Sequence, residues 1–146
     1  MSSAPNHSVV LTHEGGIATL TLNRPDALNA INVAVAEAFL AHCQTLANDD
    51  SVRVVVIRGE GKAFGVGGDL ATLQTDSVNS ANALISRLHE AVLILAKLNA
   101  PVIASLHGVV AGGSLSLSSA CDLAIAAEGT RFNLAYANVA ASCDVS

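Results

Sequence analysis

The chain has 146 residues, of which 51% are hydrophobic and only 13% are charged, and this fits one domain with an ample apolar core. The formal net charge of −5 argues against binding to nucleic acid and gives no attraction to anionic membranes. No basic segment followed by a short apolar run opens the sequence, and no uncharged apolar run is long enough to span a membrane, so we expect a cytoplasmic protein.

The beginning of the chain predicts a β-hairpin. Residues 1–7 are polar and are expected to be disordered. Ser8–Thr12 and Ile17–Asn23 alternate apolar and polar residues, as half-buried strands do, and a Glu-Gly-Gly turn at residues 14–16 separates them.

A helix and a buried strand are expected next. Apolar residues recur at helical spacing from Val35 to Ala47, and either Asn29 or Asn32 is suited to cap this helix. Val52–Arg58 is a nearly continuous run of β-branched residues, which is typical of a strand covered on both faces.

A longer amphipathic helix is predicted over Ala81–Leu98, where apolar residues at helical spacing extend for about five turns. The polar stretch Thr75–Ser80 before it is expected to be mobile. His89 and Glu90 are adjacent on this helix and point about 100° apart, so they make a poor catalytic pair and are expected on the surface.

The cysteines do not indicate a metal site. They stand at positions 43, 121 and 143, an odd set without the spacing of metal ligands. Cys43 and Cys121 lie on apolar faces, which predicts small core residues in a reducing compartment.

Two glycine-rich turns carry the chemical signal of the sequence. Lys62–Leu70, KAFGVGGDL, follows one predicted strand, and the pair Gly112-Gly113 follows a second one at Val102–Leu106 and leads into a helix of small residues. Two turns that both leave backbone N–H groups available can hold one oxyanion between them, which stabilises charge developing on a carbonyl oxygen. Ser114 does not belong to a serine nucleophile elbow, because that pattern needs glycine where Ser116 stands.

Four segments together resemble the crotonase family, the enoyl-CoA hydratase/isomerase superfamily. They are NRPDALNA at 23–30, KAFGVGGDL at 62–70, APVIASLHGVVAGGSLSL at 100–117 and ACDLAIA at 120–126, in family order. The resemblance implies an α/β fold, a crotonase-like spiral of repeated ββα units that the hairpin would begin. Residues 1–146 would form one such core domain, here lacking the C-terminal helical region, and its absence would leave apolar surface exposed.

The resemblance also implies the ligand and the assembly. Family members act on acyl thioesters of coenzyme A, which is part of the substrate, so no separate cofactor is expected. They usually form a homotrimer or a hexamer. The thioester oxygen would lie between the backbone amides of Gly68 and Gly113. Arg24 and Lys62 are expected to contact the nucleotide end of coenzyme A, and the remaining substrate contacts would be Ala27, Leu28, Ala63, Gly67, Asp69 and Leu70. For Asp69, a cap of the short segment Leu70–Leu73 is the alternative role.

The carboxylates decide between the reactions of the family. Hydratases use two glutamates, and the corresponding positions here are Ser116 and Tyr136, which would only line the acyl pocket. One general acid or base contributes about 10² to 10⁴ in rate, so the loss of both argues against water addition. Asp144 lies eight residues beyond Tyr136, where some isomerases of the family carry an essential aspartate and aryl-CoA dehalogenases a nucleophilic one.

The predicted function is therefore an enoyl-CoA isomerase that shifts a double bond by proton transfer. Asp144 would remove and return the proton, and the Gly68 and Gly113 amides would hold the thioester enolate. The alternatives are a hydratase-like enzyme, an aryl-CoA dehalogenase-like enzyme and a non-catalytic protein that binds acyl-CoA.

Overall fold

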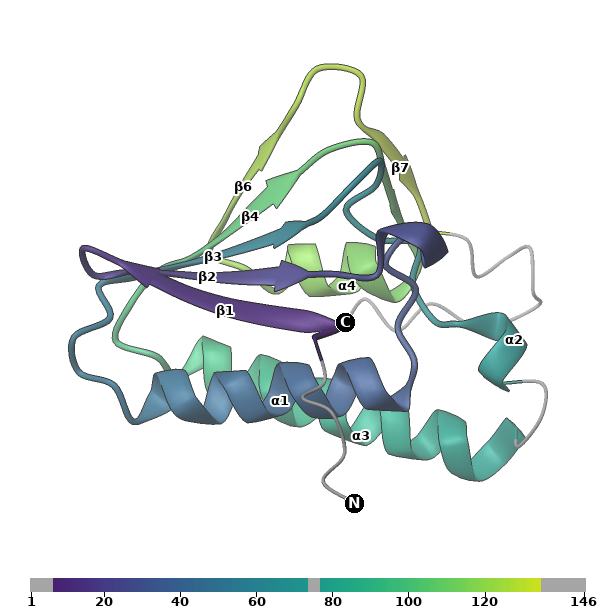
Figure 1. Cartoon of the computed structure of the whole chain (residues 1–146), viewed down its shortest axis with the longest axis horizontal. Helices are drawn as coiled ribbons and strands as arrows, with labels where there is room; N and C mark the ends of the chain where they lie inside the picture. The colour runs from purple at the N-terminus through teal and green to yellow at the C-terminus, as the bar shows by residue number, and fades with distance from the viewer. Residues whose placement is uncertain (1–6, 74–76, 135–146) are drawn as a thin grey trace.

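A five-stranded sheet forms one layer of the protein (Figure 1). The computed structural model describes residues 7–73 and 77–134. In spatial order the strands are β1 (Val9–Glu14), β2 (Ile17–Leu22), β3 (Val54–Gly59), β4 (Val102–Leu106) and β6 (Leu123–Ala126). β1 and β2 pair in antiparallel fashion, as the predicted hairpin requires, and all other neighbours are parallel. Parallel neighbours need crossover connections, and helices provide them.

The helices pack along one face of this sheet (Figure 1). After the 3-10 turn Pro25–Ala27, α1 (Val33–Ala47) connects β2 to β3. The short α2 (Leu70–Leu73) and the long α3 (Ser77–Ala96) lie between β3 and β4, and α4 (Gly113–Ser119) lies between β4 and β6. α1 and α3 lie side by side and run in the same direction, because each returns the chain to the start of a parallel strand.

A second, smaller set of strand pairings brings the 62–70 turn and the Gly112-Gly113 turn together. β5 (Val109–Ala111) pairs in parallel with β7 (Arg131–Asn133), and two isolated parallel bridges join Ile31 to Gly68 and Gly65 to Val110. Each unit thus contributes a strand of the large sheet, a short pairing of the small one and a helix. This arrangement confirms the predicted α/β class with repeated units, and β1 adds an edge strand to the first of them.

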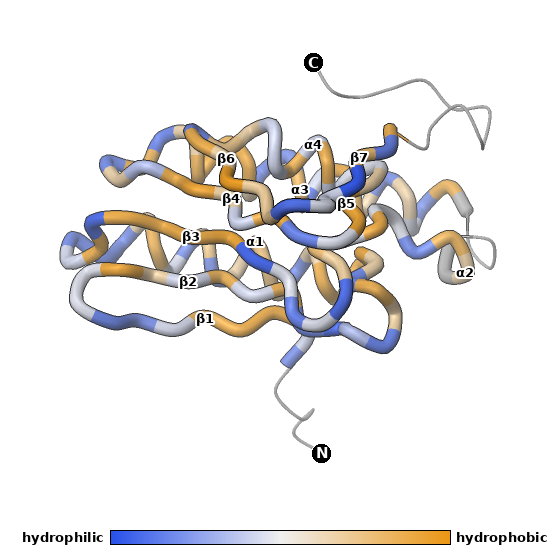
Figure 2. The backbone as a smooth tube through the Cα atoms, turned by 90° about the horizontal axis from the view of Figure 1, so that it is seen from above, coloured by the Kyte–Doolittle hydropathy of each residue, from blue (hydrophilic) through white to orange (hydrophobic). Residues whose placement is uncertain are grey.

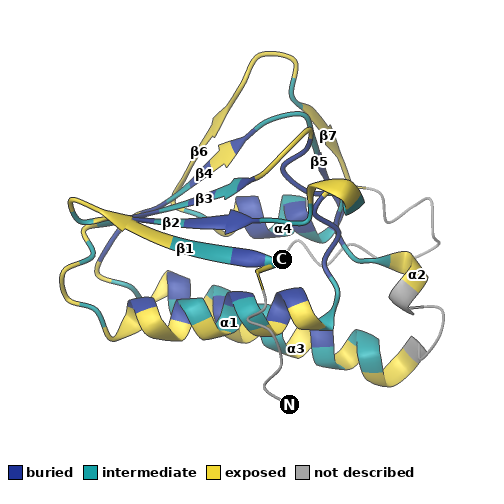
Figure 3. Ribbon diagram, viewed as in Figure 1, coloured by how far each residue is buried: buried dark blue, intermediate teal, exposed yellow. Residues whose placement is uncertain are grey.

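The core lies between the large sheet and the two long helices. Buried apolar side chains alternate along β2 and β3, and those of α1 and α3 pack against them; the fully buried ones include Leu20, Val55, Ile57, Phe39 and Ala91. Figure 2 shows apolar residues along β3 and β6, and Figure 3 shows that β2 is mostly buried whereas β6 is exposed. The prediction that Val52–Arg58 is covered on both faces is wrong for the described residues, since Val54 and Val56 are only half-buried.

The edge of the large sheet at β6 exposes apolar side chains. Leu123 and Ile125 are 61% and 67% exposed, and Phe132 in β7 and Leu134 directly after it are 53% exposed each. Within the described part of the chain, β6 pairs only with β4. Apolar side chains are therefore exposed along an edge strand, whose free backbone groups can pair with another strand.

Helix boundaries differ from the sequence prediction at their N-terminal ends. α3 begins at Ser77, so residues 77–80 of the stretch expected to be mobile are helical, whereas residues 74–76 lie outside the described part. Apolar spacing marks only the buried face of a helix, and a polar, exposed first turn gives no such signal. His89 and Glu90 are exposed, as expected. Asn32 caps α1, because its Oδ1 accepts a hydrogen bond of 2.9 Å from the N–H of Val35.

The two described cysteines are free thiols: Cys43 is buried in the core, and Cys121 is half-buried and packs against it. Burial raises the pKa of the Cys43 thiol to about 12. Burial, with a smaller contribution from the Asp122 charge, raises the pKa of the Cys121 thiol to about 11. Both thiols are therefore protonated at neutral pH. The prediction of a small core residue is confirmed for Cys43, whereas Cys121 lies at the margin of the core. Across residues 7–73 and 77–134, no helix has the length and hydropathy that a membrane crossing requires.

Candidate functional site

The two glycine-rich turns predicted to act together lie in contact. Gly65 pairs with β5 through an isolated bridge: its N–H donates to the Val109 carbonyl at 3.2 Å, and its carbonyl accepts from the Ala111 N–H at 2.9 Å. On the other side of the same turn, the Gly67 carbonyl accepts a hydrogen bond of 2.7 Å from the Ile31 N–H. The 62–70 turn is thus held between residue 31 and β5.

The closest approach of the two turns requires glycine. Gly67 has a φ of +88°, in the left-handed region, and a Cβ added there would lie 2.9 Å from the Gly113 nitrogen and 3.1 Å from the Ala111 carbonyl oxygen. Gly112 also has a positive φ, of +54°, and leads directly into α4. The backbones around the two predicted donors are therefore in direct contact.

The N–H groups of Gly68 and Gly113 have no acceptor among residues 7–73 and 77–134. In a trans peptide the N–H points opposite to the preceding carbonyl, so the Gly68 N–H points away from Ile31, to which the Gly67 carbonyl is bonded. Gly113 is the first residue of α4, and its N–H has no acceptor within the helix. Neither N–H donates a hydrogen bond to any residue that the structure describes. A Cβ added to Gly113 would meet no atom within 4 Å, so open space lies beside it.

Arg24 and Asp69, both expected to contact substrate, form an ion pair between the 23–30 segment and the 62–70 turn. The Arg24 Nη1 lies 3.3 Å from the Asp69 Oδ2 and also donates to the Ala30 carbonyl at 2.7 Å. The Asp69 N–H donates to the Ile31 carbonyl at 2.9 Å. One nitrogen of the guanidinium is thus engaged inside the protein, and Asp69 joins the 62–70 turn to the 23–30 segment. The proposed contacts of both residues with coenzyme A stay predictions.

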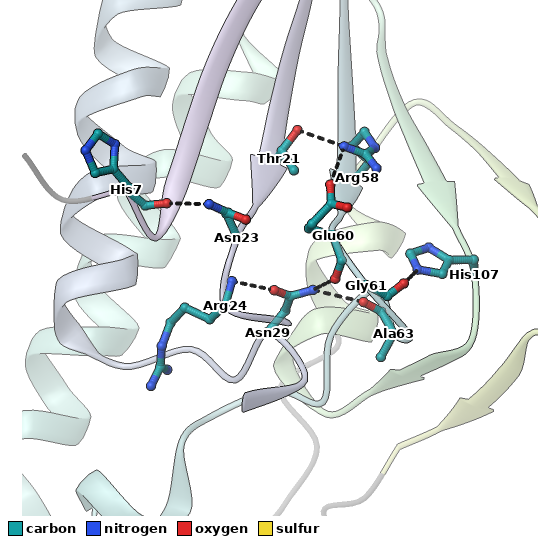
Figure 4. A network of polar contacts seen from close by, with 10 residues as sticks. All are labelled: His7, Thr21, Asn23, Arg24, Asn29, Arg58, Glu60, Gly61, Ala63 and His107. Atoms are coloured by element: carbon teal, nitrogen blue, oxygen red, sulfur yellow. Dashed lines mark hydrogen bonds and ion pairs between the residues drawn. The ribbon is translucent and has the colours of Figure 1, made fainter. Parts of the chain in front are cut away.

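Asn29 connects the same two segments from a buried position (Figure 4). Its Oδ1 accepts from the Arg24 N–H at 2.8 Å, and its Nδ2 donates to the carbonyls of Glu60 and Ala63, at 2.9 Å each. Sequence reasoning considered Asn29 only as a helix cap, and that alternative is wrong, since Asn32 is the cap. Its left-handed φ of +56° is typical of asparagine in a turn. As a result, the exposed Lys62 lies on a turn fixed against the segment that carries Arg24.

Replacing Asn29 with alanine is expected to lower the free energy of unfolding by about 2 to 4 kcal/mol, because three hydrogen bonds are lost and buried polar groups are left without partners. Urea denaturation of the whole chain measures this. Asn23→Ala is the control, because the Asn23 Nδ2 makes one exposed bond, to the His7 carbonyl at 3.0 Å, and its loss should cost less than about 1 kcal/mol. Equal losses in the two variants would contradict the anchoring role of Asn29.

The remaining predicted contacts divide into exposed and buried positions. Leu28 and Leu70 are 43% and 55% exposed, so each presents an apolar surface to the outside. Ala27 and Ser116 are half-buried, and the Ala63 side chain is buried. Tyr136 and Asp144 lie outside the described residues. No group of three His, Cys, Asp or Glu side chains suited to hold a metal ion occurs in the described part.

Sequence reasoning missed the role of Ser114. This residue follows Gly113 on α4 and is fully buried, and its Oγ accepts a hydrogen bond of 3.1 Å from the Gly67 N–H. The only signal in the sequence was a hydroxyl placed directly after a glycine pair, which the turn pattern alone does not interpret.

The fold repeats a strand, a short pairing and a helix, and it brings two glycine turns into backbone contact. The chain belongs to the enoyl-CoA hydratase/isomerase family, whose model matches residues 12–143. This confirms the resemblance noted in the sequence.

Particular relatives span several reactions. The chain is 36% identical to a trans-2-decenoyl-[acyl-carrier-protein] isomerase of Streptococcus mutans, over 90% of this chain and 51% of the relative. It is 32% identical to 4-chlorobenzoyl coenzyme A dehalogenase-2 of Arthrobacter sp., over 100% of this chain and 54% of the relative. A solved enoyl-CoA hydratase of Mycobacterium smegmatis superposes with a TM-score of 0.88 at 38% identity, over 94% of this chain and 54% of that one. The chain therefore spans about half the length of these proteins and shares their fold over that half.

Proposed function

We propose that the chain forms the thioester-binding half of an enoyl-CoA isomerase. The observation that supports this most directly is that the N–H groups of Gly68 and Gly113 have no acceptor among the described residues, on two turns in backbone contact. Two donors on neighbouring turns suit one carbonyl oxygen, because such an oxygen accepts two hydrogen bonds at once.

The proposed chemistry places the thioester oxygen between these donors. When a proton leaves the carbon beside the thioester, or the carbon one double bond further on, the electron pair delocalises and negative charge collects on that oxygen. The two hydrogen bonds then strengthen, and each donor of this kind contributes about 10² to 10³ in rate. Returning the proton to a different carbon moves the double bond, and no atom is gained or lost.

Asp144 is the proposed base and acid for both transfers. One carboxylate can take the proton from one carbon and return it to another, so a single residue completes the isomerisation. At the first of the two positions where hydratases of the family carry glutamates, α4 carries the half-buried Ser116, and Tyr136 stands at the second. A serine hydroxyl is a far weaker base than a carboxylate, which favours isomerisation over water addition.

A dehalogenase-like reaction is the second candidate, favoured by the similarity to the Arthrobacter enzyme. There the same Asp144 would attack an aryl carbon and displace halide, and water would then hydrolyse the aryl ester. Both reactions need the thioester oxygen bound by the same two amides. They differ in whether the carboxylate receives a proton or forms a covalent bond.

The remaining parts of the proposal concern coenzyme A and assembly. Lys62, exposed on the 62–70 turn, and the outer nitrogens of Arg24 would contact the nucleotide phosphates, and the exposed Leu28 and Leu70 would contact apolar parts of the ligand. Coenzyme A enters as part of the substrate, without a separate cofactor. A homotrimer or hexamer is the proposed assembly.

The test is proton exchange at the α and γ carbons of a 3-enoyl-CoA in D₂O, with the position of the double bond followed by NMR. Exchange with migration is expected and would support the isomerase. Halide release from 4-chlorobenzoyl-CoA without such exchange would favour the dehalogenase. Binding without either reaction would favour a non-catalytic acyl-CoA-binding protein, and failure to bind any acyl-CoA would overturn the proposal.

A further inference from the structure

Ser114 is a fully buried polar residue with a partner on the opposite turn. Its Oγ accepts a hydrogen bond of 3.1 Å from the Gly67 N–H, 47 residues earlier in the sequence. The other hydroxyls of α4 for which a bond is described act within the helix, since Ser118 and Ser119 donate to the Leu115 carbonyl at 2.8 and 2.9 Å. Of these three hydroxyls, only that of Ser114 joins α4 to the 62–70 turn.

The Ser114 side chain packs directly against Gly65, where the absence of a side chain leaves room for it. A Cβ added to Gly65 would collide with the Ser114 Oγ and would lie 3.0 Å from the Ser114 Cβ. The serine side chain therefore occupies the volume that a side chain at position 65 would fill. Its position is fixed by packing as well as by the hydrogen bond, because interiors are close-packed.

The hydrogen bond fixes one of the two peptide groups of Gly67, and a second bond fixes the other. The Gly67 N–H is held by Ser114, and the Gly67 carbonyl is held by the Ile31 N–H at 2.7 Å. Gly67 is a glycine at φ +88°, whose conformation no side chain restricts. With both groups held, the peptide between residues 67 and 68 is oriented, and the Gly68 N–H with it.

We propose that Ser114 is a positioning residue that sets the spacing of the two thioester donors. It directly follows Gly113, which carries one donor, and its hydroxyl holds the residue before Gly68, which carries the other. A change in the length or direction of this link moves one donor relative to the other. This inference rests on the proposed thioester site and adds to it the residue that adjusts its geometry, because donors must be aligned closely with the developing oxyanion.

The experiment compares Ser114→Ala, which removes only the hydroxyl, with Ser118→Ala, which removes a buried hydroxyl of the same helix whose described hydrogen bond goes to Leu115 within that helix. The probe is hexanoyl-CoA labelled with ¹³C at the thioester carbonyl, whose stretching frequency falls when the oxygen accepts strong hydrogen bonds. Bound to the unchanged protein, the probe should show a clear downshift. Ser114→Ala should lose most of this downshift while the Kd changes by less than about threefold, and Ser118→Ala should retain it.

In turnover, kcat should fall about tenfold in Ser114→Ala at nearly constant KM, because one misaligned donor weakens mainly the transition state.

Amide hydrogen exchange tests the link without any ligand. Exchange at the Gly67 N–H should be at least about tenfold faster in Ser114→Ala than in the unchanged protein. Exchange at the Asp69 N–H, which is bonded to Ile31, should stay the same. Ser114→Gly also removes the acceptor without a methyl group against Gly65, and the same effects are expected from it if the alanine variant folds poorly.

The outcomes separate this inference from the proposed function. A full downshift in Ser114→Ala together with unchanged exchange at Gly67 would overturn the positioning role and leave the thioester site standing. A bound probe without any downshift in the unchanged protein would overturn the site and the positioning role together. Loss of downshift in both serine variants would also overturn the role, since it would show a general effect of the helix.

Discussion

Replacing Gly113 with proline is expected to lower kcat by about 10² to 10³, which corresponds to the loss of one donor to the developing oxyanion. Proline has no N–H, so the change removes the proposed donor itself. The first position of a helix tolerates proline well, because its N–H has no intrahelical acceptor and the φ of proline suits a helix. The variant should therefore fold. Because the proline ring takes the place of the amide hydrogen that would face the thioester oxygen, weaker acyl-CoA binding should accompany the loss of turnover.

Gly113→Ala is the matched variant, because alanine keeps the N–H. A Cβ at this position meets no described atom within 4 Å, so the backbone need not move. Steady-state kinetics of the two variants, together with their urea denaturation midpoints, separate loss of the donor from loss of structure. Turnover by a folded Gly113→Pro protein at the unchanged rate would contradict the role of this amide in catalysis.

Long strands and helices can be recognised in this sequence, whereas short strands that depend on distant partners cannot. The hairpin, the strand Val102–Leu106 and the buried face of α3 follow from periodicity, because each repeats over enough residues to be seen. β5 and β7 have three residues each, too few to show a period, and only their pairing with distant segments defines them. The small sheet was accordingly missed, although it is the element that brings the two glycine turns together.

The candidate site likewise contains residues that a local sequence pattern reveals and residues that only distant partners explain. The two glycine-rich turns could be found from the sequence because glycine turns after strands have a recognisable pattern. The choice of Gly68 and Gly113 within them came from the family resemblance and stays a prediction. Asn29 and Ser114 could not, because their partners lie on other segments: Glu60 and Ala63 for the asparagine, Gly67 for the serine. A buried polar side chain is chosen by the groups that face it in space, and these are not adjacent in sequence.

Replacing Asp144 with asparagine is expected to reduce isomerisation by about 10² to 10⁴, the range typical of one general acid or base. Asparagine has nearly the same shape as aspartate but does not take up a proton at neutral pH, so binding of the acyl-CoA should change little. The measurement is the rate of double-bond migration in D₂O, with the Kd of a saturated acyl-CoA measured alongside. A control is Asp26→Asn, an exposed carboxylate in the 23–30 segment whose loss should leave migration nearly unchanged.

The same variant also discriminates between the candidate reactions. If Asp144 shuttles a proton, Asp144→Asn should abolish α and γ exchange together, because one group serves both carbons. If Asp144 is a nucleophile, halide release should disappear, whereas 3-enoyl-CoA should fail to exchange even in the unchanged protein. A fully active Asp144→Asn protein would contradict both mechanisms, and catalysis would then require a base from another part of the protein. Since Ser116 is the α4 residue at a hydratase glutamate position, Ser116→Glu would show whether a second carboxylate there directs the bound thioester toward water addition.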